Sequence, residues 1–177
     1  MIRSFEKVTP KFGANCYIDE SAEVIGDVEL GEDCSVWPLT VIRGDVNYIR
    51  IGDRSNIQDG CVFHVSHAGD FNPDGSPLIV GNDVTVGHKA ILHACTVGNE
   101  CLIGMGAVVM DNAIIEDQVI VGAGALVSPG KHLERGHLYV GNPCRKAREL
   151  KPGEIDFLRY SADHYVRLKN RYMNSEK

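Results

Sequence analysis

Three histidines, His64, His88 and His93, have the side chains that best suit a catalytic metal centre in this sequence. Neutral imidazole is a common ligand of Zn²⁺. A zinc ion with three protein ligands and one open position is typical of a catalytic site, whereas a structural zinc normally has four protein ligands, often cysteines. The sequence offers no obvious fourth ligand, so it predicts a catalytic zinc. Imidazole also accepts Fe²⁺ or Co²⁺, which leaves the metal itself open.

A six-residue repeat of aliphatic side chains indicates which elements must position these histidines. An α-helix would need apolar spacings of three and four, and a simple two-layer sheet would need longer alternating runs joined by hairpins. The period of six is instead typical of a left-handed parallel β-helix built from hexapeptide repeats, in which three units form one triangular coil. The repeat includes the following residues: Ile18, Val24, Leu30, Val36, Ile42, Ile51, Ile57, Phe63, Val80, Val86, Leu92, Val97, Ile103, Val109, Ile115, Val121 and Val127.

We expect residues 1–177 to form a single domain, with the β-helix over residues 14–131. Residues 154–173 carry apolar side chains at helical spacing among charged ones, which predicts an amphipathic helix packed on the outside of the β-helix. Acidic Glu154 lies in the first turn of this segment, and Lys169 and Arg171 lie near its end, as the helix dipole favours.

Counting the faces of the coil places two of the histidines in one column. We treat the polar stretch after His64, around residues 72–75, as an inserted loop. Arg43, His64 and His93 then each follow an inward-facing residue of the same face. Neighbouring strands are about 4.7–4.9 Å apart, so the imidazoles of His64 and His93 can converge on one ion.

His88 falls on a different face, two positions after the inward-facing Val86. One chain therefore cannot easily bring all three histidines together. In a cyclic trimer each interface sets one face of a subunit against a different face of its neighbour. The sequence thus predicts a homotrimer with a metal at each of its three interfaces.

The composition argues against nucleic-acid and membrane partners and favours small-molecule ligands. A formal net charge of −6 argues against binding to nucleic acid, because contacts with phosphates need a basic face. No apolar run approaches the roughly 20 residues of a membrane span, and the first residues lack the apolar core of a signal peptide. The six cysteines include no CxxC pair and suit a reducing compartment. We expect a cytoplasmic protein that acts on small molecules, without a membrane or nucleic-acid partner.

Several short motifs resemble the gamma-class carbonic anhydrase family, and the likeness covers nearly the whole chain. They are Arg43-Gly44-Asp45, Asn56-Ile57-Gln58-Asp59-Gly60, His64, and the run from Val86-Gly87-His88 to Leu92-His93. The segment Ser161-Ala162-Asp163-His164-Tyr165-Val166 is similar to a motif in the C-terminal helix of the compact bacterial branch of that family. The resemblance implies a zinc held by His64 and His93 of one subunit and His88 of the next, with CO₂ and bicarbonate as substrate and product.

The resemblance also implies roles for residues around the metal. Gln58 would orient the metal-bound water and Asn56 would support Gln58, while Arg43 and Asp45 would make charge contacts across the trimer interface. Asp59, which lies beneath His88 in the same column, is a candidate hydrogen-bond partner for that histidine. Tyr165 would reach the pocket from the terminal helix.

The expected reaction is hydration of CO₂. Zinc lowers the pKa of a bound water from 15.7 towards about 7, and the resulting hydroxide attacks CO₂ to give bicarbonate. The chain departs from well-known members of the family by carrying Val46 and His67 where they carry glutamates that export protons. His67 can relay protons near neutral pH, but without the acidic residues we expect turnover to be low.

Three other functions remain open from the sequence. The first is a metal-dependent hydrolase of the acyl-CoA thioesterase type. The second is a metal-independent hexapeptide acyltransferase, which uses the same fold with one catalytic histidine. The third is a non-catalytic scaffold, since this fold readily forms rigid trimers.

Overall fold

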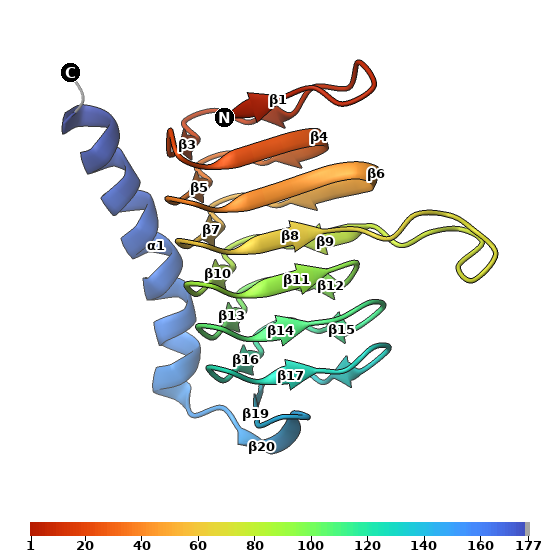
Figure 1. Ribbon diagram of the computed structural model, residues 1–177. Coiled ribbons are helices and arrows are strands. Elements are labelled where there is room, and N and C mark those ends of the chain that lie inside the picture. Colours follow the sequence, from red (N-terminus) through yellow and green to blue (C-terminus); the bar gives the residue numbers. More distant parts are fainter. Residues whose placement is uncertain (176–177) are drawn as a thin grey trace.

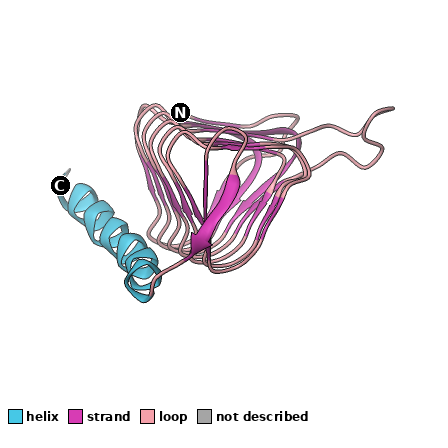
Figure 2. Ribbon diagram, turned by 90° about the horizontal axis from the view of Figure 1, so that it is seen from below, coloured by secondary structure: helices cyan, strands magenta, loops and turns pink. Residues whose placement is uncertain are grey.

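The computed structural model describes residues 1–175 and shows a left-handed parallel β-helix with one long α-helix along its side (Figure 1). Viewed along its axis, the β-helix is triangular (Figure 2). The architecture predicted from the six-residue repeat is confirmed. A long loop, residues 65–77, projects from the coil after β8 and confirms the predicted insertion.

Two of the three faces belong to one sheet, because β4 (Glu23–Leu30) and β6 (Val41–Ile51) run around the corner between them. We call one the histidine face; besides the start of β6 it contains β8 (Val62–His64), β11 (Ile91–His93), β14 (Val108–Val109) and β17 (Leu126–Val127). The other, the third face, contains β9 (Leu78–Val80), β12 (Thr96–Val97), β15 (Ile114–Ile115) and β18 (His132–Leu133). Near the N-terminus, β1 (Ile2–Arg3) and β2 (Lys11–Phe12) pair with β4.

The remaining face, which we call the helix face, forms the second sheet. Its parallel strands are β3 (Tyr17–Ile18), β5 (Ser35–Val36), β7 (Asn56–Ile57), β10 (Thr85–Val86), β13 (Leu102–Ile103), β16 (Ile120–Val121) and β19 (His137–Val140). The antiparallel strand β20 (Arg145–Glu149) closes this sheet at one edge. Strands of the β-helix therefore extend beyond residues 14–131 at both ends.

The inward side chains stack in register from coil to coil. Ile42 pairs with Phe63 and Phe63 with Leu92 on the histidine face, as the face counting predicts. On the helix face, Ile57, Val86 and Ile103 form the corresponding column. These residues are fully buried, so each coil covers the apolar surface of the next, and no coil buries its core alone.

The corners of the coil need unusual backbone geometry. The corner between the helix face and the histidine face carries Lys89 with a φ of 59° and Gly60 with a φ of 70°. At the same corner, a Cβ atom on Gly87 would lie 2.8 Å from the backbone nitrogen of Met105, so only glycine fits there without a shift of the next coil. This tight corner holds the backbone of His88 in place.

The helix α1 (Pro152–Ser175) packs beside the helix face and is slightly longer than the predicted 154–173. The single tryptophan, Trp37, is 5% exposed, and its ring centroid lies 5.6 Å from that of Tyr165 and 5.1 Å from that of Tyr172 on α1. Within residues 1–175, no helix is long and apolar enough to cross a membrane.

Lys169 differs from the sequence-based expectation. We expected a cation near the end of the helix, but Lys169 is fully buried and lies more than a turn before the end. Its Nζ donates hydrogen bonds to Asp33 Oδ1 at 2.9 Å and to Asn170 Oδ1 at 2.7 Å. Lys169 therefore fastens the helix to the β-helix through an ion pair whose cation is buried and whose carboxylate is partly exposed.

Candidate metal centre

His64 and His93 lie side by side on the histidine face, one coil apart. The strand register pairs the two residues directly, and His64 Nδ1 lies 3.1 Å from His93 Nε2. Two nitrogens bound to one tetrahedral Zn²⁺ at about 2.0–2.1 Å are about 3.3 Å apart. The 3.1 Å separation of these two ring nitrogens is therefore close to the value for a shared metal ion.

An aspartate holds the other nitrogen of each of these rings. Asp45 Oδ1 is 3.1 Å from His64 Nε2, and Asp111 Oδ1 is 2.8 Å from His93 Nδ1. A carboxylate on the far side of a metal-binding imidazole fixes its tautomer and its orientation. Both histidines therefore carry the support that ligands of a metal normally have.

His88 lies apart from this pair, at the corner that follows β10. Its Nδ1 is 2.9 Å from Asp59 Oδ2, so the column predicted for Asp59 and His88 brings the two side chains together. Among residues 1–175, no cluster of three or more histidine, cysteine or acidic side chains is arranged to hold a metal within one chain.

Burial of His64 favours its neutral imidazole, while hydrogen bonds keep the nearby carboxylates ionised. Burial lowers the pKa of His64 and outweighs the hydrogen bond that its ring makes to the Asp45 carboxylate, which acts to raise that pKa. Burial would raise the pKa of Asp45, but hydrogen bonds from Arg43 and His64 outweigh it and hold that pKa below its usual range. Burial would likewise raise the pKa of Asp111, but hydrogen bonds from Ser66 and His93 outweigh it and hold that pKa below its usual range. Neutral imidazole is the form that binds a metal.

Arg43 contacts Asp45 within the same chain. The resemblance implies charge contacts across a subunit interface for these two residues. In the chain itself, Asp45 instead bridges Arg43 and His64. The Arg43 side chain remains 42% exposed.

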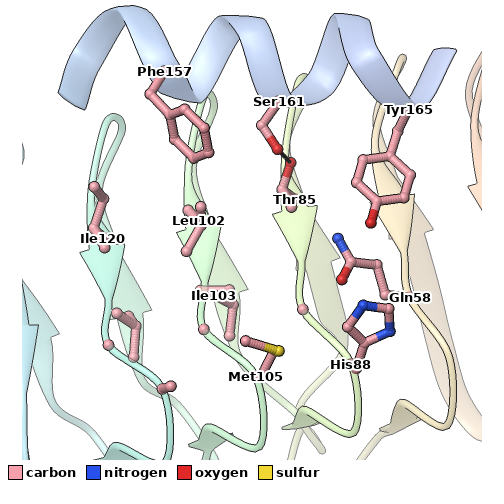
Figure 3. Close-up of a pocket in the computed structure, with 15 residues that line it drawn as sticks. Gln58, Thr85, His88, Leu102, Ile103, Met105, Ile120, Phe157, Ser161 and Tyr165 are labelled. Atoms are coloured by element: carbon pink, nitrogen blue, oxygen red, sulfur yellow. Dashed lines mark hydrogen bonds between the residues drawn. The ribbon is translucent and has the colours of Figure 1, made fainter. Parts of the chain in front are cut away.

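A cavity of about 470 Å³ lies between α1 and the helix face, with His88 at one end (Figure 3). Gln58 and Tyr165 line the same end, whereas the rest of the wall is largely apolar: Leu102, Ile103, Met105, Ile120, Val121 and Phe157. Burial, with a smaller contribution from Asp59, raises the pKa of the Tyr165 hydroxyl. The structure therefore brings Gln58, His88 and Tyr165 together on one cavity.

The orientation of Gln58 is fixed by a buried chain of amides. Gln58 Nε2 donates to Asn56 Oδ1 at 3.2 Å, and Asn56 Nδ2 donates to Thr85 Oγ1 at 3.0 Å. Asn56 is 1% exposed and Gln58 is 6% exposed. Because its nitrogen is engaged, the Oε1 atom of Gln58 is the end available to accept a hydrogen bond.

Sequence reasoning missed Asp111 and its partner Ser66. Asp111 comes two residues after the inward-facing Val109, one coil beyond His93, which is the signal that could have identified it. Val46 and His67, which occupy the positions of the family's glutamates, are both exposed. His67 lies near the base of the projecting loop, and Val46 lies within β6.

Comparison with known proteins gives one family model and several full-length relatives. The model for the bacterial transferase hexapeptide, six repeats, matches residues 94–129. The Escherichia coli protein YrdA is 51% identical over 98% of this chain and 95% of its own length. A protein of Methanocaldococcus jannaschii named as a probable carbonic anhydrase is 42% identical over 87% of this chain and 92% of its own length.

Two further comparisons concern a plant relative and a solved structure. Gamma carbonic anhydrase 1 of Arabidopsis thaliana mitochondria is 40% identical over 95% of this chain, which spans 60% of that protein. The crystal structure of a hexapeptide transferase family protein from Anaplasma phagocytophilum superposes with a TM-score of 0.90 and 38% identity, covering 97% of this chain and 98% of the other. Relatives with this fold thus carry both carbonic anhydrase and transferase names.

Proposed function

From its membership of the gamma-class carbonic anhydrase family of hexapeptide-repeat proteins, we propose that this chain is a zinc-dependent enzyme that converts CO₂ and water to bicarbonate. The zinc would be held by His64 and His93 of one subunit and by His88 of the next. The observation that carries this proposal is the 3.1 Å separation of the His64 and His93 ring nitrogens, each ring held on its other side by an aspartate. Fe²⁺ and Co²⁺ suit the same ligands.

A homotrimer is the assembly that completes this ligand set. The histidine face exposes Val62 and Ile91, each 40% exposed, in the strands that carry His64 and His93. Met105, 58% exposed, lies in the same corner column as His88. Apolar surface around both halves of a site is what an interface between copies of the chain would cover. The six free cysteines suit a reducing compartment and support a cytoplasmic location.

A zinc ion held by these histidines would supply a hydroxide nucleophile for CO₂ at neutral pH, because bound water then has a pKa of about 7. Gln58 Oε1 would accept a hydrogen bond from that water and orient it, because Asn56 holds the Gln58 amide group in one direction. Tyr165 would border the position of CO₂ and exclude bulk water from that end of the cavity. Exposed His67 would carry protons to solvent in place of the missing glutamates.

Metal analysis paired with an assay of CO₂ hydration tests this function. Protein purified without chelators should contain about one zinc per chain and should hydrate CO₂. His88→Ala should lose most of its metal and its activity. His132→Ala is the matched control, because His132 lies on the third face and contacts Glu116, and its metal content should not change. Full metal content in His88→Ala would remove His88 from the ligand set.

The cavity favours a second candidate function, hydrolysis of an acyl thioester by the same metal. Its volume of about 470 Å³ is much larger than CO₂ needs, and its largely apolar wall suits an acyl chain. Hydrolysis of acyl-CoA by the zinc-loaded protein, without hydration of CO₂, would favour this alternative. Acyl transfer that survives removal of the metal would instead favour a hexapeptide acyltransferase, the activity class that the name of the Anaplasma phagocytophilum relative suggests.

A further inference from the structure

We propose that Asp111 is the positioning residue for His93 and that the base of the projecting loop holds Asp111 in place for this role. The inference rests on the proposed metal site, because it concerns how one ligand of that site is oriented. Asp111 Oδ1 lies 2.8 Å from His93 Nδ1, which leaves His93 Nε2 directed at His64. The aspartate thus selects the ring nitrogen that faces the metal.

Asp111 is itself held by the loop. Ser66 Oγ donates a hydrogen bond to Asp111 Oδ2, so the two carboxylate oxygens have separate partners, one serine and one histidine. The backbones of Ser66 and Ser76 pair with each other through two hydrogen bonds of 3.0 Å, which closes the base of the loop. The Ser66 backbone is thereby fixed relative to Ser76 on the other side of the loop base.

The second serine of the loop base fastens the neighbouring residue of the same corner. Ser76 Oγ donates to Asn112 Oδ1 at 2.7 Å, and Ser76 is 5% exposed. Asn112 adopts a φ of 59°, and its backbone nitrogen donates to Ala94 O at 2.7 Å, directly after His93. Two serines of the loop base therefore hold two consecutive residues beneath His93.

The hydrogen bonds to both Asp111 oxygens orient His93 for metal binding. A free carboxylate at Asp111 would have several rotamers, and His93 could then rotate away from His64 or adopt the other tautomer. With Asp111 fixed on both oxygens, the imidazole is oriented before the metal arrives, which reduces the cost of ordering it on binding. Next to exposed Phe71 at the loop tip, Asn72 Nδ2 donates a hydrogen bond to Ser76 Oγ at 3.0 Å, so the tip supports the loop base.

Zinc affinity of the trimeric protein, measured by competition with a chromogenic chelator, tests the inference. We expect Asp111→Ala to bind zinc about 10- to 100-fold more weakly, in the range found for lost partners of metal ligands. Asp111→Asn keeps an oxygen for His93 but loses the charge, so its affinity should lie between the wild type and Asp111→Ala. Ser66→Ala should weaken binding by less than Asp111→Ala.

A matched control and a second measurement separate positioning from folding. Glu116→Ala removes a carboxylate from an exposed histidine, His132, at 2.7 Å, so it breaks the same kind of contact away from the site. It should leave zinc affinity unchanged. The visible spectrum of the Co²⁺-loaded protein should change in Asp111→Ala and not in Glu116→Ala, while both variants keep the wild-type unfolding midpoint within a few degrees.

The outcomes distinguish this inference from the proposed function. If wild-type protein binds zinc and both Asp111 variants bind it within twofold of the wild type, Asp111 does not position His93 and the zinc site stands. If the wild type itself binds no metal, the proposed function fails and the role of Asp111 fails with it. The inference is supported if zinc affinity falls in Asp111→Asn and falls further in Asp111→Ala, while Glu116→Ala keeps the wild-type affinity.

Discussion

The amide nitrogen of Gln58 is used in a hydrogen bond within the protein, whereas its amide oxygen is available to a ligand in the cavity. Its Nε2 atom donates to Asn56 Oδ1, and Gln58 lines the cavity together with His88 and Tyr165. In the proposed function its Oε1 atom would accept a hydrogen bond from the reacting water. We expect Gln58→Ala to lower kcat/KM for CO₂ hydration by about tenfold or more, with zinc content unchanged. Gln118→Ala, which changes an amide on a distant corner, is the control. Loss of zinc in Gln58→Ala would show that Gln58 supports the metal rather than the reacting water.

Cys16 is the cysteine with the greatest thiolate character. Neighbouring Cys34 lowers the pKa of the Cys16 thiol to about 7, with a smaller contribution from the Lys169 ammonium, and these outweigh burial. Burial raises the pKa of Cys61 and Cys101 to about 12, and it also raises the pKa of Cys95. Since the thiolate is the reactive form, iodoacetamide at pH 7.5 should label the native protein mainly at Cys16, as read by peptide mass spectrometry. Equal labelling at the other cysteines would contradict the low pKa of Cys16.

At the scale of the element, α1 depends on one buried cation. Lys169→Ala leaves Asp33 without its partner, and the part-exposed carboxylate can regain some hydration. We therefore expect a loss of about 1–3 kcal/mol in the free energy of unfolding, below the cost of a fully buried broken pair. Urea titration followed by Trp37 fluorescence measures this, because Trp37 contacts α1. Arg171 is an exposed residue of the same helix, and Arg171→Ala should change the free energy of unfolding by less than about 0.5 kcal/mol. Equal effects of the two changes would contradict the role assigned to Lys169.

Strand register and the placement of outward side chains could be predicted from the sequence wherever the six-residue repeat fixes which residues point inward. Inward residues recur every six positions, so Phe63 and Leu92 predict the register of their strands, and His64 and His93 follow from it. The predicted column of Asp59 and His88 also forms a hydrogen bond. Asp111 could not be predicted in the same way, because its contact with His93 depends on the side-chain rotamer and on the hydrogen bond from Ser66. The burial of Lys169 depends on how α1 is rotated against the coil, which the apolar pattern alone does not fix.

At the scale of the whole molecule, the fold separates the two halves of the proposed metal site. His64 and His93 lie on the histidine face, whereas His88 follows a strand of the helix face at the adjoining corner. Identical subunits around a threefold axis can repeat one contact between these two surfaces three times. Metal binding should therefore depend on assembly, and dilution of the protein into monomers should release the metal.

Complementation between two variants tests this shared site most directly. His88→Ala keeps the histidine pair, and His64→Ala keeps His88, so each variant alone should lack an intact interface. In trimers assembled at random from equal amounts of the two, about one quarter of the interfaces would join an intact pair to an intact His88. After removal of weakly bound metal, we expect close to one quarter of the wild-type zinc in the mixed trimers and almost none in either parent. No recovery in mixed trimers, or full zinc in His88→Ala alone, would contradict a metal shared between subunits.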